Sequence, residues 1–262
     1  MDKTVAKAFG LIETLSLSEA GRGVTDLAAE LGLTKANVHR LLKTLVALGY
    51  VRKEEGSSRY EPSLKLWELA SRVVHRHDLM AVAPPIVRAL CRDTGESVQL
   101  AVRDGSSVVY VDKADSAHPV RATTQVGSRV PIYCVSTGKA ILAASEDPSS
   151  GLKFPLTAYT PQTITSREQL EHELTQVRRQ GYAVNRGEWR SDIWGVAAAI
   201  VNARGETAGA IGVWGPEERF RGAKLKEIGA AVVAAAGKIS KEMGNLVQPA
   251  PGRKGPNRGR EK

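Results

Sequence analysis

The sequence predicts an α+β protein that begins with a winged helix-turn-helix, continues through a linker helix and ends in a larger domain of strands and helices. Two helices separated by a glycine, followed by a strand-turn-strand pattern, predict the winged helix-turn-helix within residues 1–62. After residue 79, apolar strand-like runs are joined by short turns, which favours an α+β sheet over an all-parallel sheet. The chain has 262 residues, of which 42% are hydrophobic, and this is sufficient for two domains.

Composition and helix signals divide the chain into four segments. We expect the winged helix-turn-helix over residues 1–62, a linker helix suited to dimerisation over 63–78, and the larger domain over 79–246. Residues 247–262 hold five basic residues and one acidic residue among prolines and glycines, which predicts a disordered basic tail. The tail therefore accounts for four of the nine net positive charges, and the net charge alone identifies no binding site.

Helical spacing and capping residues predict three helices in the N-terminal segment. Apolar residues recur at helical spacing over 4–17, which predicts the first helix. Thr25 is the expected N-cap of a short second helix over 26–31, and Thr34 is the expected N-cap of a third over 35–48. A glycine between the last two helices supplies the turn of a helix-turn-helix.

A hairpin and a linker helix complete the first part of the chain. Residues 50–61 read as strand, turn and strand, which predicts the wing. Ser63 is the expected cap of a helix over 64–77. A helix that leaves a small domain in this way is suited to linking and dimerisation.

The larger domain is predicted from apolar runs punctuated by glycine, proline and serine. Pro84 and Pro85 are expected to introduce a helix that stops near Gly95, and Ser136 is an N-cap candidate for a later one. Ser166 is expected to cap a further helix over 167–180. The remaining elements are strands over 97–103, 108–112, 120–124, 196–202 and 208–214, and a last helix over 223–246.

The outward face of the third helix carries the side chains that reading a DNA major groove requires. With the apolar face of this helix buried, the opposite face is basic, polar and free of acidic residues. Lys and Arg bind phosphates or guanine, Asn binds adenine, and Ala leaves room for a thymine methyl group. The alternative to a DNA-binding surface is a solvated basic face on an ordinary helical bundle. The predicted DNA-binding residues are Thr25, Thr34, Lys35, Ala36, Asn37, His39, Arg40, Lys43, Ser58 and Arg59.

Several classes of protein are excluded or disfavoured by the sequence. Cys91 and Cys134 are the two cysteines and form no Cys-x-x-Cys pair, so a disulfide scaffold is disfavoured and a reducing cytoplasm is expected. No apolar run is long enough to span a membrane. His75 and His77 lie two apart, so on a helix they do not face one metal ion. We expect no metal, no cofactor and no membrane partner.

At this point the sequence resembles the IclR-type transcriptional regulators. The run from Thr25 to Val51 is similar to their N-terminal domain. Their effector-domain signature is resembled by Gly127-x-x-Val130-Pro131 with the run 136–143, and by Gly181-Tyr182-Ala183-Val184 with Glu188. The whole resemblance spans about residues 3–246, with the motifs in the right order. The resemblance implies that the chain is not an enzyme but a repressor or activator, a homodimer or dimer of dimers, with a GAF-like effector domain. The partners would be operator DNA and a small carboxylate.

The resemblance also implies where the effector binds. Family members that bind small keto or hydroxy acids use the start of the helix at Ser136 and positions on later strands, and a helix N-terminus suits a carboxylate. Asn185 stands where an acidic residue is common, and Asn37 stands near a position where the family usually has Thr. The candidate effector-binding residues are Cys134, Ser136, Thr137, Asn185, Trp189, Trp194, Gly195, Gly212 and Trp214.

Glycine and tryptophan at these positions indicate a larger effector. Gly195 and Gly212 replace larger residues and are expected to open space, whereas Trp214 replaces a small residue and supplies a flat apolar wall. We therefore expect an acid with an aromatic or bulky apolar body, whose binding controls catabolic genes. The alternative for each tryptophan is packing in the core or in a dimer interface.

Two other functions compete with this interpretation. A cytosolic hydrolase acting through Cys134, with an accessory helix-turn-helix, would need a His or acidic partner that the sequence does not offer. A DNA-binding architectural protein that responds to no ligand is disfavoured because residues 79–246 form a full-sized domain.

Overall fold

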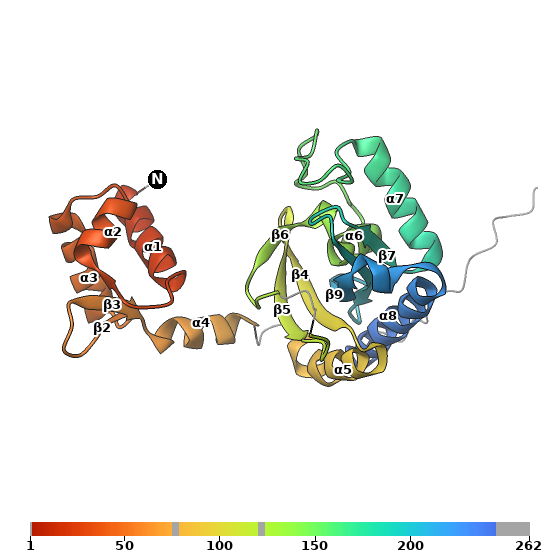
Figure 1. Cartoon of the computed structure of the whole chain (residues 1–262), viewed down its shortest axis with the longest axis horizontal. Coiled ribbons are helices and arrows are strands. Elements are labelled where there is room, and N and C mark those ends of the chain that lie inside the picture. Colours follow the sequence, from red (N-terminus) through yellow and green to blue (C-terminus); the bar gives the residue numbers. More distant parts are fainter. Residues whose placement is uncertain (1, 75–78, 120–123, 245–262) are drawn as a thin grey trace, which may run out of the picture. The chain divides into compact units, whose positions relative to one another are not determined.

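The computed structural model describes residues 2–74, 79–119 and 124–244, and it divides into two compact units between residues 76 and 77. Each unit has its own apolar core and is described by itself. The expected helix-turn-helix and the expected α+β domain are both confirmed (Figure 1). His75, His77, most of the strand expected over 120–124 and the tail 247–262 lie outside the described residues.

Three helices form the core of the N-terminal unit: α1 (Lys3–Ser16), α2 (Val24–Glu30) and α3 (Lys35–Ala47). Their inward residues include Leu11 and Val38, both at 0% exposure, because apolar side chains recur at helical spacing on one face of each helix. Gly32 adopts a φ of +61° between α2 and α3, a conformation that favours glycine.

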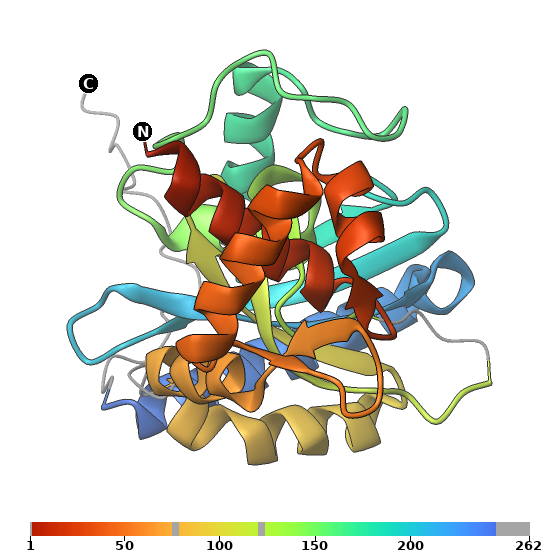
Figure 2. The same cartoon turned by 90° about the vertical axis from the view of Figure 1, so that its left-hand side faces the viewer.

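A small antiparallel sheet lies beside these helices, and Figure 2 shows its orange hairpin. It consists of β1 (Arg22–Gly23), β3 (Arg59–Pro62) and β2 (Val51–Lys53), in that order. This hairpin is the predicted wing. Helix α4 (Leu64–Val74) follows, and the Ser63 hydroxyl accepts a hydrogen bond from the Lys65 N–H at 3.2 Å, as expected of a cap.

The second unit is built on a six-stranded antiparallel sheet. The strand order is β6-β5-β4-β9-β8-β7, so two three-stranded meanders meet where β4 pairs with β9. Antiparallel pairing suits the short turns that the sequence contains. The strands are β4 (Ser97–Asp104), β5 (Ser107–Ala114), β6 (Arg129–Pro131), β7 (Ala183–Arg186), β8 (Ile193–Val201) and β9 (Thr207–Pro216).

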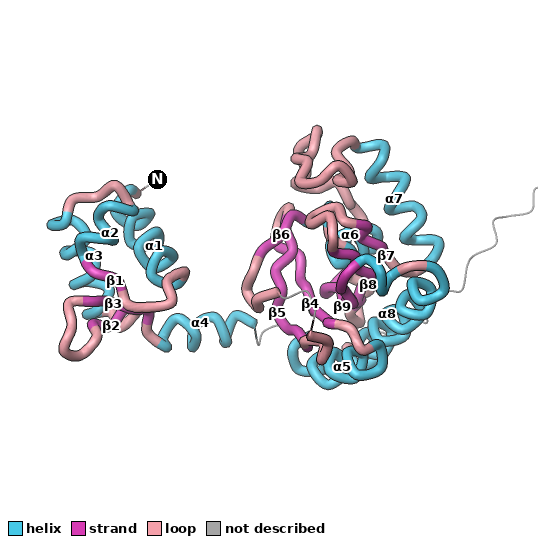
Figure 3. Tube along the Cα trace, viewed as in Figure 1, coloured by secondary structure: helices cyan, strands magenta, loops and turns pink. Residues whose placement is uncertain are grey.

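Helices cover both faces of this sheet (Figure 3). Val196 of β8 packs in the core that includes α5 and α8, whereas Ala197 packs in the core that includes α6 and α7, because neighbouring strand residues face opposite ways. The helices are α5 (Leu79–Thr94), α6 (Ser136–Ala144), α7 (Arg167–Gln180) and α8 (Gly222–Glu242), with short 3₁₀ turns at Ile132–Cys134 and Glu217–Phe220.

Three expected helix starts are wrong in detail. Helix α2 begins at Val24 with Gly23 as its N-cap, so Thr25 lies inside the first turn. Helix α6 has Val135 as its N-cap, and Ser136 is the first helical residue. Helix α5 begins at Leu79, so Pro84 and Pro85 lie inside it, where they donate no backbone hydrogen bonds, rather than at its start. The expected N-caps Thr34 and Ser166 are confirmed by hydrogen bonds to backbone N–H groups.

Candidate functional site

The first candidate site is the outward face of α3. The helix buries Val38, Leu41, Leu42 and Leu45, which turns its opposite face to solvent. Lys35, Ala36, His39, Arg40 and Lys43 are exposed on that opposite face, Asn37 is half-buried, and none of them is acidic. The structure therefore brings six of the predicted DNA-binding residues onto one helix.

A hydrogen bond within this face orders two of its polar side chains. The Arg40 guanidinium donates to Asn37 Oδ1 at 3.3 Å, one helical turn away. At the start of the helix, Thr34 Oγ1 accepts from the Asn37 N–H at 3.3 Å. This hydrogen bond fixes the Arg40 and Asn37 side chains relative to each other, which the sequence did not indicate.

The remaining predicted DNA-binding residues lie on neighbouring elements. Thr25 is exposed in the first turn of α2, although it does not cap that helix. Ser58 and Arg59 are exposed on the hairpin, and Arg59 Nη1 donates to the Gly21 carbonyl at 3.0 Å. Arg59 therefore also ties the wing to the segment before α2.

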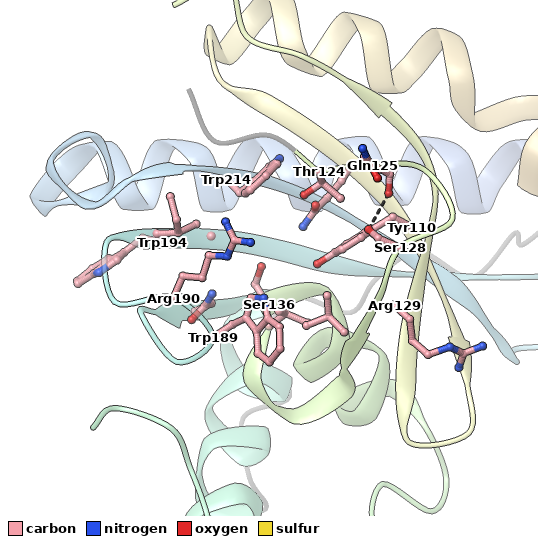
Figure 4. Close-up of a pocket in the computed structure, with 16 residues that line it drawn as sticks. Tyr110, Thr124, Gln125, Ser128, Arg129, Ser136, Trp189, Arg190, Trp194 and Trp214 are labelled. Carbon is pink, nitrogen blue, oxygen red and sulfur yellow. Dashed lines mark hydrogen bonds between the residues drawn. The ribbon is translucent and has the colours of Figure 1, made fainter. Parts of the chain in front are cut away.

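The second candidate site is a cavity of about 400 Å³ between the sheet and the start of α6 (Figure 4). It lies at the carboxyl end of β7, where the segment before β8 passes over the sheet. Six of the nine residues proposed to bind an effector line it: Ser136, Asn185, Trp189, Trp194, Gly195 and Trp214.

The other three do not line the cavity. Cys134 and Thr137 are both at 0% exposure, and Cys134 Sγ donates to the Pro131 carbonyl at 3.3 Å. The pKa of the Cys134 thiol is raised to about 12, mainly by burial, so the thiol stays protonated and is unsuited to act as the nucleophile of a hydrolase. Gly212 is also absent from the lining.

The expectation that the two glycines open space is wrong. A Cβ at Gly212 would lie 2.9 Å from Thr137 Cγ2, and a Cβ at Gly195 would lie 2.9 Å from Ser136 Oγ. Both approaches are closer than normal carbon contacts. The glycines therefore let the start of α6 pack directly against β8 and β9, and the side chains of α6 fill the space.

The tryptophans divide between the two faces of the sheet. Trp214 faces α6, and Trp189 lies at the cavity with its ring 4.4 Å from that of Tyr159. The Trp194 ring projects away from the other labelled residues in Figure 4 and packs against the core on the α5 and α8 side. The aromatic walls of the cavity are therefore Trp189, Trp214 and Tyr110 rather than the three predicted tryptophans.

The start of α6 presents unpaired polar groups to the cavity. Val135 supplies no side-chain cap, and Lys139 is the first residue whose N–H bonds back to the N-cap carbonyl, at 3.0 Å. Ser136 is at 3% exposure, and its hydroxyl has no hydrogen-bond partner among the described residues. A helix N-terminus with free N–H groups attracts an anion.

Sequence reasoning missed the polar wall contributed by β4 and β5. Gln99 and Tyr110 line the cavity at 4% exposure each, and Gln99 Oε1 has no partner in the described parts of the chain. Burial raises the pKa of Tyr110 to about 12, so its hydroxyl remains a donor. One signal was available, because Gln99 interrupts the apolar run from Val98 to Val102, but Gln99 and Tyr110 meet only in the folded sheet.

A buried ion pair lies beneath the cavity. Lys139 of α6 is fully buried, and its Nζ donates to Glu188 Oε1 at 2.7 Å, to Glu173 Oε1 at 2.9 Å and to the Val184 carbonyl at 2.6 Å. Burial raises the pKa of Glu188, although Lys139 beside it acts in the opposite direction. The pair fastens the segment that carries Trp189 to α6.

Two further classes of site are absent from the described residues. No helix there is long and apolar enough to cross a membrane. No group of three or more His, Cys, Asp or Glu side chains in the same residues is placed to hold a metal ion.

Two family models match the chain in order. The model of the IclR helix-turn-helix domain matches residues 4–55, and the model of the bacterial transcriptional regulator IclR C-terminal domain matches residues 71–241.

Characterised relatives and solved structures agree with these matches. The transcriptional regulator KdgR of Escherichia coli is 34% identical over 246 residues, which cover 92% of each chain. The Thermotoga maritima IclR structure has a TM-score of 0.79 at 26% identity and covers 92% of this chain and 98% of its own. An IclR homologue of Microbacterium hydrocarbonoxydans, solved in complex with 4-hydroxybenzoate, has a TM-score of 0.79 at 24% identity and covers 92% and 99%.

Proposed function

Because the chain belongs to the IclR family of bacterial transcriptional regulators, we propose that it binds an operator through α3 and that a small aromatic carboxylate controls this binding. We also propose that the chain acts as a homodimer or as a dimer of dimers. We place its action in the cytoplasm, where operator DNA lies, and we propose catabolic genes as its targets.

The acid-free outward face of α3 is the observation that carries the DNA-binding part. Arg40, Lys43 and Lys35 bind phosphates or guanine edges, while Asn37 and His39 tune the sequence preference. The first turn of α2, the N-terminus of α3 and the wing residues Ser58 and Arg59 bind the DNA backbone.

An affinity measurement tests this assignment. The change Arg40→Ala is expected to weaken binding to a duplex selected from a random pool by about 1–3 kcal/mol, because an arginine that reads a base contributes that much. Fluorescence anisotropy measures the change. Arg204→Ala, which removes an exposed arginine from the turn between β8 and β9, is the matched control. Equal affinities of the two variants would overturn the role of Arg40.

The effector part rests on the chemistry of the cavity. Free N–H groups and the Ser136 hydroxyl at the start of α6 suit a carboxylate, and Trp189, Trp214 and Tyr110 suit an aromatic ring. A solved homologue that is complexed with 4-hydroxybenzoate has the same fold. Its identity of 24% supports the fold only, so the chemistry of the cavity carries the argument.

The oligomeric part rests on an apolar face of α4. Leu64 and Trp67 are 84% and 70% exposed on this helix, which is unfavourable for large apolar side chains in a monomer. We assign this face to a homodimer, or to a dimer of dimers, in which the effector shifts the population between geometries that do and do not match the operator half-sites. Sedimentation velocity of Trp67→Glu, which should favour the monomer, tests the assignment.

A further inference from the structure

The cavity contains charge of one sign. Among the described residues that line it, Arg129 and Arg190 are charged and none is acidic. The two arginines differ in their ion-pair and hydrogen-bond partners. Arg129 is paired with the Asp104 carboxylate and also donates to the Asp104 carbonyl at 3.4 Å. The Arg190 side chain has no partner among the described residues.

The two side chains also differ in direction. Figure 4 shows the Arg190 guanidinium directed toward the space between Trp214 and Ser136, whereas Arg129 points away from the other labelled residues. Arg190 is exposed, so its charge is not already buried and compensated. Neither the Arg190 guanidinium nor the hydroxyl of Ser136, a residue at 3% exposure, has a hydrogen-bond partner among the described residues, so together they suit an anionic ligand group.

The backbone before Arg190 is held firmly. Glu188 binds Lys139 through its side chain, its N–H donates to Asn185 Oδ1 at 2.9 Å, and its carbonyl accepts from Thr163 Oγ1 at 2.6 Å. The Gly187 carbonyl accepts from Thr160 Oγ1 at 2.7 Å. Because these bonds already fix the backbone at residues 187 and 188, little further backbone entropy is lost when Arg190 binds a ligand.

We propose that Arg190 binds the carboxylate of the effector together with the start of α6, and that it makes the cavity selective for the acid over its neutral amide. This inference rests on the proposed function, since it assumes that the cavity is the effector site. A guanidinium donates two parallel hydrogen bonds to a carboxylate, whereas a neutral amide offers one acceptor oxygen and no charge. The aromatic body then lies against Trp189 and Trp214.

Calorimetry of the full chain tests the proposal with benzoate, phenylacetate and 4-hydroxybenzoate, each compared with its amide. In Arg190→Gln we expect the affinity for the acid to fall about 10- to 100-fold, the range typical of a lost hydrogen bond to a charged group, while the affinity for the amide stays within about threefold. Arg190 is exposed, so the variant should fold normally.

Arg186→Gln is the matched control, because Arg186 belongs to the same segment but lies over the Trp194 ring, 5.9 Å from its centroid. An equal loss of acid affinity in both variants would indicate general electrostatics and overturn the role of Arg190. Unchanged acid affinity in Arg190→Gln, or equal losses for acid and amide, would also overturn it. Absence of binding by any of these acids to the unaltered chain would instead contradict the proposed effector class itself.

Discussion

The buried lysine beneath the cavity permits a quantitative prediction about stability. The change Lys139→Met keeps an unbranched side chain at a fully buried position but removes the three hydrogen bonds of Nζ. It leaves the Glu188 carboxylate, at 6% side-chain exposure, without its cation and leaves the Val184 carbonyl without its donor. Removing one partner of a buried ion pair costs about 3–5 kcal/mol, because the other charge remains buried and uncompensated.

Urea unfolding followed by tryptophan fluorescence measures this cost in the second unit, which contains Trp189, Trp194 and Trp214. Lys113→Met is the matched control, since Lys113 pairs with Asp115 at 2.9 Å with side-chain exposures of 30% and 37%. A surface pair of this kind contributes at most about 1 kcal/mol. The double variant Lys139→Met/Glu188→Gln should recover part of the loss. The reasoning would be refuted by equal destabilisation in Lys139→Met and Lys113→Met.

Two further predictions concern the same packing. Because burial raises the pKa of Glu188, its contribution to stability is full below the ordinary glutamate pKa and is lost as the pH rises through the raised value. Relative to the unaltered chain, Glu188→Gln should therefore show a flatter decline in the free energy of unfolding as the pH rises from about 4.5; a steeper decline would contradict the sign. Gly138→Ala should prevent normal folding of the second unit, because the added Cβ would lie 1.8 Å from the Ile132 carbonyl oxygen. The control Gly237→Ala should fold, because the space around its new Cβ is open. Circular dichroism and thermal unfolding distinguish the two variants, and a normally folded Gly138→Ala would refute the packing.

Local signals in the sequence predicted correctly which face of α3 is buried and which is exposed. Helical spacing of Val38 and the leucines determined which face of α3 is buried, and Thr34 was identifiable as a cap from residue type and position alone. These features depend on neighbours within one helix. The contact between Arg40 and Asn37 also lies within the helix, but it depends on side-chain rotamers that the sequence does not specify.

Features that depend on distant segments were missed or misread. The sequence showed small residues at Gly195 and Gly212, but only the fold shows that the start of α6 occupies the space beside them. Alternation along β8 places Trp194 on the opposite face from Gly195, and this could have been read from the strand pattern. Lys139 offered no local signal, because its partners come from β7, α7 and the segment around Glu188.

Occupation of the cavity is expected to change how tightly α3 binds DNA. The most direct test is the affinity of the full chain for a duplex selected from a random pool, measured by fluorescence anisotropy with and without an aromatic acid shown by calorimetry to bind the cavity. We expect a change of about 5- to 150-fold, the range of typical coupling free energies between two sites. An affinity that is the same with and without a saturating concentration of that acid would contradict the claim and favour a DNA-binding protein that responds to no ligand.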